Sequence, residues 1–101
     1  MEKAAGGMSK PATVNNPEVI KDVTARLRRI EGQARGIQRM IEEGRPCAEV
    51  IVQLSALRNA VNKVATTLIV ENLEACILQK NPQMDPREAL REAKRLFLSL
   101  S

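Results

Sequence analysis

The sequence predicts an all-α protein made of two long helices and one short helix. Helix-forming residues dominate its 101 positions, and few β-branched runs alternate in the way a strand requires. Apolar residues instead recur every three or four positions over two long stretches. Phe97 is the single aromatic residue. A chain of this length allows one domain.

The first helix is expected from about Pro17 to Glu43. Residues 1–15 are small and polar and contain Gly and Pro, which predicts a disordered arm before a helical domain of residues 16–101. Asn16 suits the N-cap, and Pro17 suits the first helical position. The helix carries a heptad-like apolar seam, made of Ile20, Val23, Leu27, Ile30, Ala34, Ile37 and Ile41.

Glycines mark two features of this helix. Gly32 and Gly36 each cost about 1 kcal/mol relative to alanine, so we expect close approach of another backbone to compensate. Gly44 is expected to end the helix, with Arg45 as the turn and Pro46 opening the next helix. So short a link predicts an antiparallel hairpin.

The second helix is expected from Pro46 to Lys80 and the third from about Pro86 to Leu98. An Asn-Pro pair and a capping box that begins at Asp85 separate them. The second helix carries the apolar row Val50, Leu54, Leu57, Val61, Val64 and Leu68. The third carries the apolar face Leu90, Ala93, Leu96 and Phe97.

One hairpin cannot bury the apolar stripes of both long helices. A monomer would expose an apolar patch too large for a soluble protein. We therefore expect the protomer to dimerise into an antiparallel four-helix bundle.

Both cysteines lie in the second predicted helix, near its two ends. At 1.5 Å per residue, Cys47 and Cys76 stand about 43 Å apart in a continuous helix. A disulfide needs Cα atoms within about 7 Å, so the two thiols of one chain cannot meet. If two copies of the helix pack antiparallel, Cys47 of one protomer comes near Cys76 of its partner.

The two thiols differ in their expected chemistry. The first turn of a helix and the neighbouring Arg45 both favour the thiolate of Cys47, which makes it the better nucleophile. Cys76 is expected to be more buried and suits a resolving thiol. Each could instead be a small buried hydrophobe, or the two thiolates could hold Cu(I). Zinc would need four ligands, and Asn72, one turn before Cys76, offers only a neutral amide.

The net charge of +4 predicts a polyanionic partner, with duplex DNA favoured because aromatic stacking platforms are absent. Lys21, Arg28, Arg35 and Arg39 share one face of the first helix. The alternative is a solvated face with ion pairs to Glu31, Glu42 and Glu43. The chain has no histidine, which excludes Ser-His-Asp and Cys-His catalysis. No membrane span or signal peptide is visible, so we expect a cytoplasmic protein.

One segment resembles a known family. VTARLRRIEGQARGIQRMIEEGRPC, followed by a long helix with ENLEAC, is similar to the copper-sensitive operon repressors, the CsoR/RcnR/FrmR family. The resemblance covers about residues 20–98. It implies an all-α dimer of dimers that releases operator DNA when an inducer binds. The Cys, His and Cys ligands of the family's copper sensors fall on Cys47, Asn72 and Cys76, and this pattern most resembles the persulfide-sensing CstR branch.

The resemblance also implies roles for other residues. The family's DNA-contacting positions fall on Arg26 and Lys63, and the acid of its third helix that supports the sensing site falls on Glu92. With the basic residues around them, the expected DNA-binding set is Arg26, Arg28, Arg29, Arg35, Arg58 and Lys63.

The resulting hypothesis is a homotetrameric repressor, not an enzyme, that needs no cofactor or resident metal. Cys47 would attack inorganic polysulfide or a low-molecular-weight persulfide, and Cys76 of the partner would close a sulfur bridge that disfavours DNA binding. Three alternatives stay open at this point. They are a two-coordinate Cu(I) sensor, a sulfur-transfer enzyme and a plain helical adaptor.

Overall fold

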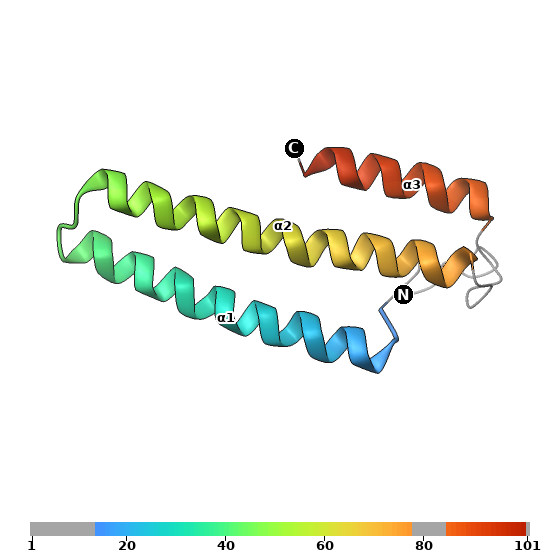
Figure 1. The fold of residues 1–101 in the computed structure, drawn as a ribbon, viewed down its shortest axis with the longest axis horizontal. Coiled ribbons are helices and arrows are strands. Elements are labelled where there is room, and N and C mark those ends of the chain that lie inside the picture. Colours follow the sequence, from blue (N-terminus) through green and yellow to red (C-terminus); the bar gives the residue numbers. More distant parts are fainter. Residues whose placement is uncertain (1–13, 78–84, 101) are drawn as a thin grey trace, which may run out of the picture. The chain divides into compact units, whose positions relative to one another are not determined.

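A computed structural model describes residues 14–77 and 85–100. The described residues form three helices and no strand, which confirms the all-α prediction: α1 (Pro17–Glu42), α2 (Cys47–Ile77) and α3 (Pro86–Ser99) (Figure 1). They belong to two compact units. Residues 17–67 hold α1 and most of α2, and the described residues from 68 onward hold the end of α2 and α3.

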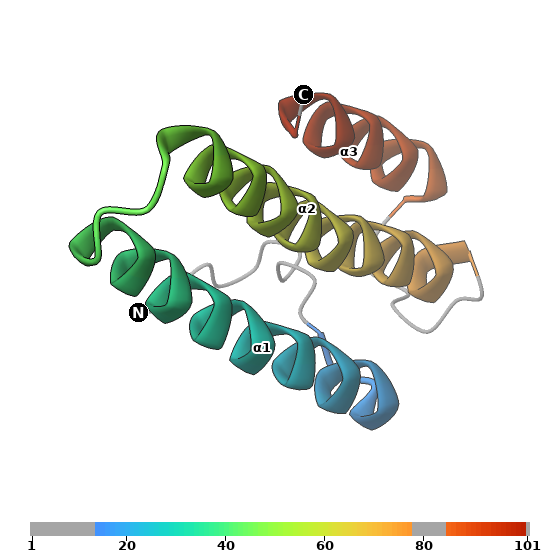
Figure 2. The same ribbon diagram turned by 60° about the vertical axis from the view of Figure 1, so that its left-hand side comes forward.

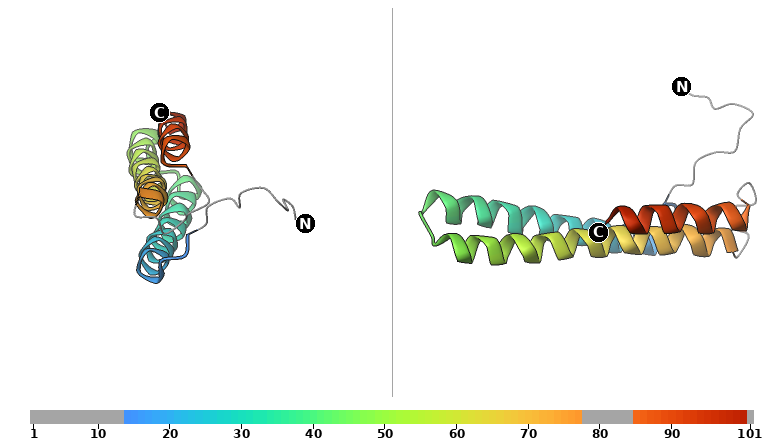
Figure 3. Two further views of the ribbon diagram at one scale, coloured as in Figure 1. Left: turned by 90° about the vertical axis from the view of Figure 1, so that its right-hand side faces the viewer. Right: turned by 90° about the horizontal axis from the view of Figure 1, so that it is seen from above.

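Within the first unit, α1 and α2 form the predicted antiparallel hairpin. The two helices run side by side from their connecting turn (Figure 2 and Figure 3). Val23 and Ile37 of α1 are buried, as are Val50 and Val64 of α2. All four belong to the seams read from the sequence. The 3.6-residue period thus predicted the stripes to which these four buried residues belong.

The turn between α1 and α2 is a Schellman motif centred on Gly44. The Gly44 N–H donates to the Ile41 carbonyl at 3.1 Å, and the Arg45 N–H donates to the Met40 carbonyl at 3.0 Å. Gly44 has a φ of 74°, a region that costs side-chain-bearing residues about 1–2 kcal/mol. Pro46 precedes the first helical residue, and its carbonyl accepts the first bonds of α2. Pro46 is thus the N-cap, and α2 begins at Cys47, one residue later than predicted.

Within the second unit, α3 lies alongside the last part of α2 (Figure 1). The Asp85 carboxylate caps α3 by accepting from the Arg87 N–H at 3.2 Å, and Pro86 occupies the first turn as predicted. The bond goes to Arg87, two residues on, and not to the third residue of a capping box.

The predicted apolar face of α3 is wrong in part. The buried residues are Ala89 and Ala93, whereas Leu90 and Phe97 are exposed. Alanine has almost no side chain, so a face built on it lets two helices approach closely. Leu90 lies about 100° around α3 from Ala89, so a buried face that contains the two alanines leaves it exposed.

Large apolar side chains remain exposed along every helix. Members of both predicted seams are among them, namely Ile20, Leu27 and Ile41 on α1 and Leu54 and Val61 on α2. The backbone contact expected at Gly32 and Gly36 is not made by the described part of the chain. Beyond the neighbouring turns of its own helix, a methyl group at either position would meet none of the described atoms within 4 Å.

Two predictions fall on other parts of the chain. Nearly all of the arm predicted for residues 1–15, and the end of the second helix predicted for 78–80, lie outside the described residues. None of the described helices combines the length and the apolar character that crossing a membrane requires.

Candidate nucleic-acid interface and thiol site

The basic side chains gather around a groove on the hairpin. An open depression of about 430 Å³ is lined from α1 by Arg26, Arg29, Ile30 and Gln33, and from α2 by Asn59, Ala60 and Lys63. The α1 residues follow steps of three and four, so they form one stripe along the helix. The antiparallel hairpin sets this stripe opposite the turn of α2 that begins at Asn59. The groove thus has cations on both helices and an apolar floor.

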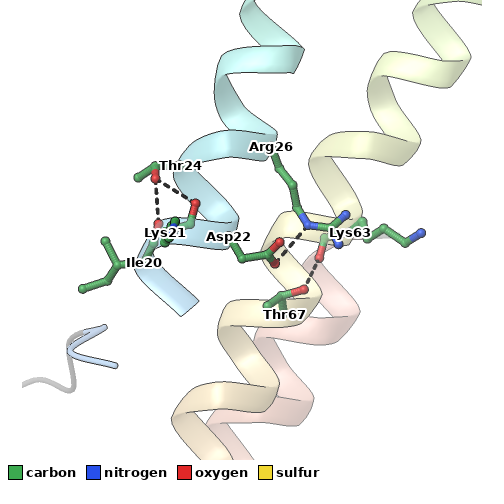
Figure 4. A network of polar contacts seen from close by, with 7 residues as sticks. All are labelled: Ile20, Lys21, Asp22, Thr24, Arg26, Lys63 and Thr67. Atoms are coloured by element: carbon green, nitrogen blue, oxygen red, sulfur yellow. Dashed lines mark hydrogen bonds and ion pairs between the residues drawn. The ribbon is translucent and has the colours of Figure 1, made fainter. Parts of the chain in front are cut away.

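Arg26 is held at the edge of this groove by a carboxylate one turn earlier. Its Nε lies 3.0 Å from Asp22 Oδ2, and both side chains extend from α1 toward α2 (Figure 4). Thr67 lies one turn beyond Lys63 and donates its hydroxyl to the Lys63 carbonyl at 2.9 Å. The Lys63 side chain extends away from Arg26. An ion pair this exposed contributes little to stability, and in this conformation the guanidinium points to Asp22.

The structure does not bring all predicted DNA-binding residues to one surface. Arg28 follows Arg26 by two residues, about 200° around the helix, and Arg35 follows it by nine, about 180°. Both are exposed on the opposite face of α1 from Arg26. Arg58 is exposed on α2 and does not line the groove. Arg26, Arg29 and Lys63 are the ones that share the groove.

The alternative interpretation of the basic face, ion pairs with neighbouring glutamates, is not observed among the described residues. Within residues 14–77 and 85–100, none of Glu31, Glu42 and Glu43 forms an ion pair. The arginines of that face are therefore not paired with these glutamates.

Cys47 is the first residue of α2, and its thiol is free and exposed. This is the helix N-terminus, where peptide dipoles favour negative charge. The cation that sequence reasoning placed beside the thiol is engaged elsewhere, because Arg45 Nη2 lies 2.6 Å from Glu49 Oε1. Arg45 is therefore paired with Glu49 and does not serve as the neighbouring cation that the sequence predicted for Cys47.

Asn72 and Glu92, both assigned to the sensing site from the sequence, lie together. The Asn72 amide nitrogen is 3.4 Å from Glu92 Oε1, and this partly buried bond joins α2 to α3. Cys76 belongs to the last turn of α2, four residues after Asn72, and its side chain lies outside the described residues. Among the described residues, no three His, Cys, Asp or Glu side chains converge as a metal site would require.

Sequence reasoning missed Gln33 and Asn59 as groove residues. Gln33 lies seven residues after Arg26 and four after Arg29, so helical spacing alone could have placed it on their stripe. Asn59 had no such signal, because its position depends on how α2 is rotated against α1.

Comparison with known proteins identifies the family. The model of the metal-sensitive transcriptional repressors matches residues 20–99. The copper-sensing repressor CsoR of Bacillus subtilis is 39% identical over 75 residues, which cover 74% of each chain. The copper-sensing repressor RicR of Mycobacterium tuberculosis is 52% identical over 52 residues, covering 52% of this chain and 54% of the relative.

A solved structure agrees with these matches. That of the nickel-responsive transcriptional regulator InrS superposes with a TM-score of 0.68 at 31% identity, over 88% of this chain and all of InrS. These relatives are transcriptional repressors and regulators rather than enzymes, and the family read from the residues is confirmed. The chain therefore belongs to the metal-sensitive transcriptional repressor family.

Proposed function

We propose that this chain is a DNA-binding repressor that releases its operator when reactive sulfur modifies Cys47. The observation that carries the proposal is the exposed thiol at the first position of α2. Such a thiol is open to attack on a dissolved persulfide or polysulfide, because neither burial nor a disulfide blocks it.

The groove provides the DNA-binding part of the proposal. Arg26, Arg29 and Lys63 line one recess and can neutralise phosphates of a duplex. Arg28, Arg35 and Arg58 stay in the proposed set, as exposed cations outside the groove. Because Arg28 and Arg35 lie on the opposite face of α1, we expect their contribution to binding to be smaller.

The exposed apolar seams support assembly. A second hairpin that packs antiparallel on the first would cover Leu27 and Ile41 on α1 and Leu54 and Val61 on α2. The same arrangement would bring Cys47 near the partner's α2 end, where Cys76 lies. Pairing of two such dimers gives the proposed tetramer, with residues 16–101 as the functional domain.

The proposed thiol chemistry has two steps. The Cys47 thiolate attacks the outer sulfur of a persulfide, RS–SH; an S–S bond forms on Cys47, the original S–S bond breaks, and RS⁻ leaves. The thiolate of Cys76 from the partner protomer then attacks the Cys47 sulfur and expels HS⁻, leaving a disulfide between protomers. The two cysteines are oxidised by two electrons, and the outer sulfur is reduced to sulfide. A bridge with additional sulfurs forms when a longer polysulfide is the oxidant.

Asn72 supports this choice of inducer. Its amide nitrogen points to Glu92, and a neutral amide is a poor ligand for a soft metal ion. The chain has no histidine that could replace it.

A second candidate is a repressor that senses Cu(I) through Cys47 and Cys76 alone. It is favoured by the similarity to CsoR and RicR, both named as copper-sensing repressors. Two thiolates suit linear coordination of this soft ion.

Duplex-binding assays under anaerobic conditions separate the two candidates. Polysulfide should abolish DNA binding by the wild type and produce a covalent dimer on a non-reducing denaturing gel. Dithiothreitol should restore DNA binding and convert the covalent dimer back to single chains. Cys47→Ser should bind DNA but ignore polysulfide. Cys76→Ser should gain sulfur on Cys47 by mass spectrometry without the crosslink.

Other outcomes would reject the proposal. Release by Cu(I), with no effect of polysulfide, would favour the copper sensor. A crosslink mapped within one chain would break the architecture, because the single helix α2 separates the two cysteines. Absence of DNA binding by the untreated wild type would reject both candidates.

A further inference from the structure

Two uncharged side chains line the basic groove, and the proposed function gives them no role. Gln33 projects into it from α1 and Asn59 from α2, beside Arg26, Arg29 and Lys63. Both amides are exposed, and neither makes a hydrogen bond to another side chain of the described residues. Each offers two N–H donors that no described protein group uses.

The concave shape of the site selects which part of a duplex can enter it. Base edges lie at the bottom of the DNA grooves, about 8.5 Å deep in the major groove, and a side chain must protrude to reach them. The phosphate backbones form the ridges of the duplex. A recess of about 430 Å³ between the two helices, lined by Ile30 and Ala60 together with the polar residues, has the concave shape that receives such a ridge.

We propose that Gln33 and Asn59 donate their amide N–H groups to phosphodiester oxygens of duplex DNA seated in this groove. The proposal rests on the DNA-binding part of the proposed function and adds two residues to it. The cations on both helices neutralise the phosphates, and the amides fix the register of the backbone between them.

Charged and neutral donors leave different signatures in the dependence of binding on salt. A cation that binds a phosphate displaces a condensed counterion, so its loss reduces the slope of log affinity against log salt concentration. An amide displaces none. Loss of Gln33 or Asn59 should therefore weaken binding by the same factor at every salt concentration. A phosphate contact should also do so equally on every sequence.

The test compares Gln33→Ala, Asn59→Ala and the double variant with wild type in the full chain. The matched controls are Gln38→Ala and Gln53→Ala, which remove exposed side chains of the same type from α1 and α2 outside the groove. Circular dichroism and light scattering check that each variant keeps the fold and assembly of the wild type. The probes are a duplex selected from a random pool by the wild type and a duplex with the same bases shuffled.

Each groove variant should lose about tenfold in affinity, the factor expected for one hydrogen bond to a charged acceptor. The loss should be equal on both duplexes, with the salt slope unchanged, and the controls should stay within about twofold of wild type. Groove variants that bind DNA as tightly as the control variants would overturn the inference. The proposed function would still stand in that case, provided that the wild type binds DNA. A loss confined to the selected duplex would indicate base reading and overturn it as well.

A further experiment distinguishes binding of the DNA backbone from binding of a free anion that also presents phosphate oxygens. Inorganic pyrophosphate is titrated into the protein in the absence of DNA by calorimetry. We expect no saturable binding at micromolar concentration. Saturable binding that disappears in the double variant would reassign the groove to a free phosphate ligand. If the wild type binds neither duplex, the proposed function itself fails, whatever the variants do.

Discussion

The proposed assembly can be tested with one substitution made at two positions of α2. Val61 and Val64 belong to the same predicted seam, three residues apart. In the isolated protomer Val64 is 6% exposed, whereas Val61 is 45% exposed. Replacing each with alanine removes the same atoms, so the difference between the two effects reports what covers Val61.

The expected magnitudes follow from the buried fractions. Two carbon groups at about 0.8 kcal/mol each give a loss of about 1.5 kcal/mol at Val64 and about 0.9 kcal/mol at Val61 in a lone protomer. The better helix propensity of alanine offsets both by a similar amount, about 0.5 kcal/mol, and leaves the difference unchanged. If a partner covers Val61, its loss should rise to about 1.5 kcal/mol per protomer, and the difference should disappear.

Urea unfolding at several protein concentrations provides the measurement. In a dimer, the unfolding midpoint should rise with protein concentration, and Val61→Ala should cost as much as Val64→Ala. The reasoning would be refuted by a folded monomer at micromolar concentration in light scattering. It would also be refuted by a concentration-independent midpoint together with a Val61→Ala cost near half that of Val64→Ala.

Three further predictions concern the groove, the inducer and the turn. Lys63→Ala should lower the slope of log affinity against log salt concentration by about 0.9 per contacting protomer. Arg26→Ala should lower this slope by less, because its carboxylate partner already neutralises part of its charge. Fluorescence anisotropy over a salt series checks this, and equal slopes in both variants and wild type would contradict it. Asn72→His should raise Cu(I) affinity in competition with a chromophoric chelator, since an imidazole joins the thiolates; an unchanged affinity would show that geometry, not residue 72, sets inducer choice. Gly44→Ala should lower the free energy of unfolding by about 1 kcal/mol or more because of its positive φ, and an unchanged urea midpoint would speak against that turn.

Local features of the sequence were sufficient to predict the helices. The period of three and four predicted both long helices and the seams that contain Val23 and Val64. Gly44 marked the end of α1, and Asp85 with Pro86 marked the start of α3. These signals act through backbone conformation and hydrogen bonds within a few residues. The capping signals can therefore be interpreted without knowledge of tertiary contacts.

The tertiary structure decided which faces meet. It selected Ala89 and Ala93 rather than Leu90 or Phe97 as the buried side of α3. It also joined Asn72 to Glu92 across two helices. The family resemblance had assigned both to the sensing site, but the direct bond between them depends on how α3 docks against α2.

The groove shows most clearly which features the sequence predicts and which depend on the tertiary structure. The sequence identified the basic residues and their positions around α1, which already separate Arg26 and Arg29 from Arg28. It could not say which turn of α2 faces them. That choice depends on the rotation of α2 against α1, which is set by the packing of the buried seam residues. The packing places Asn59 and Lys63 opposite the α1 stripe and so turns separate charges into one recess.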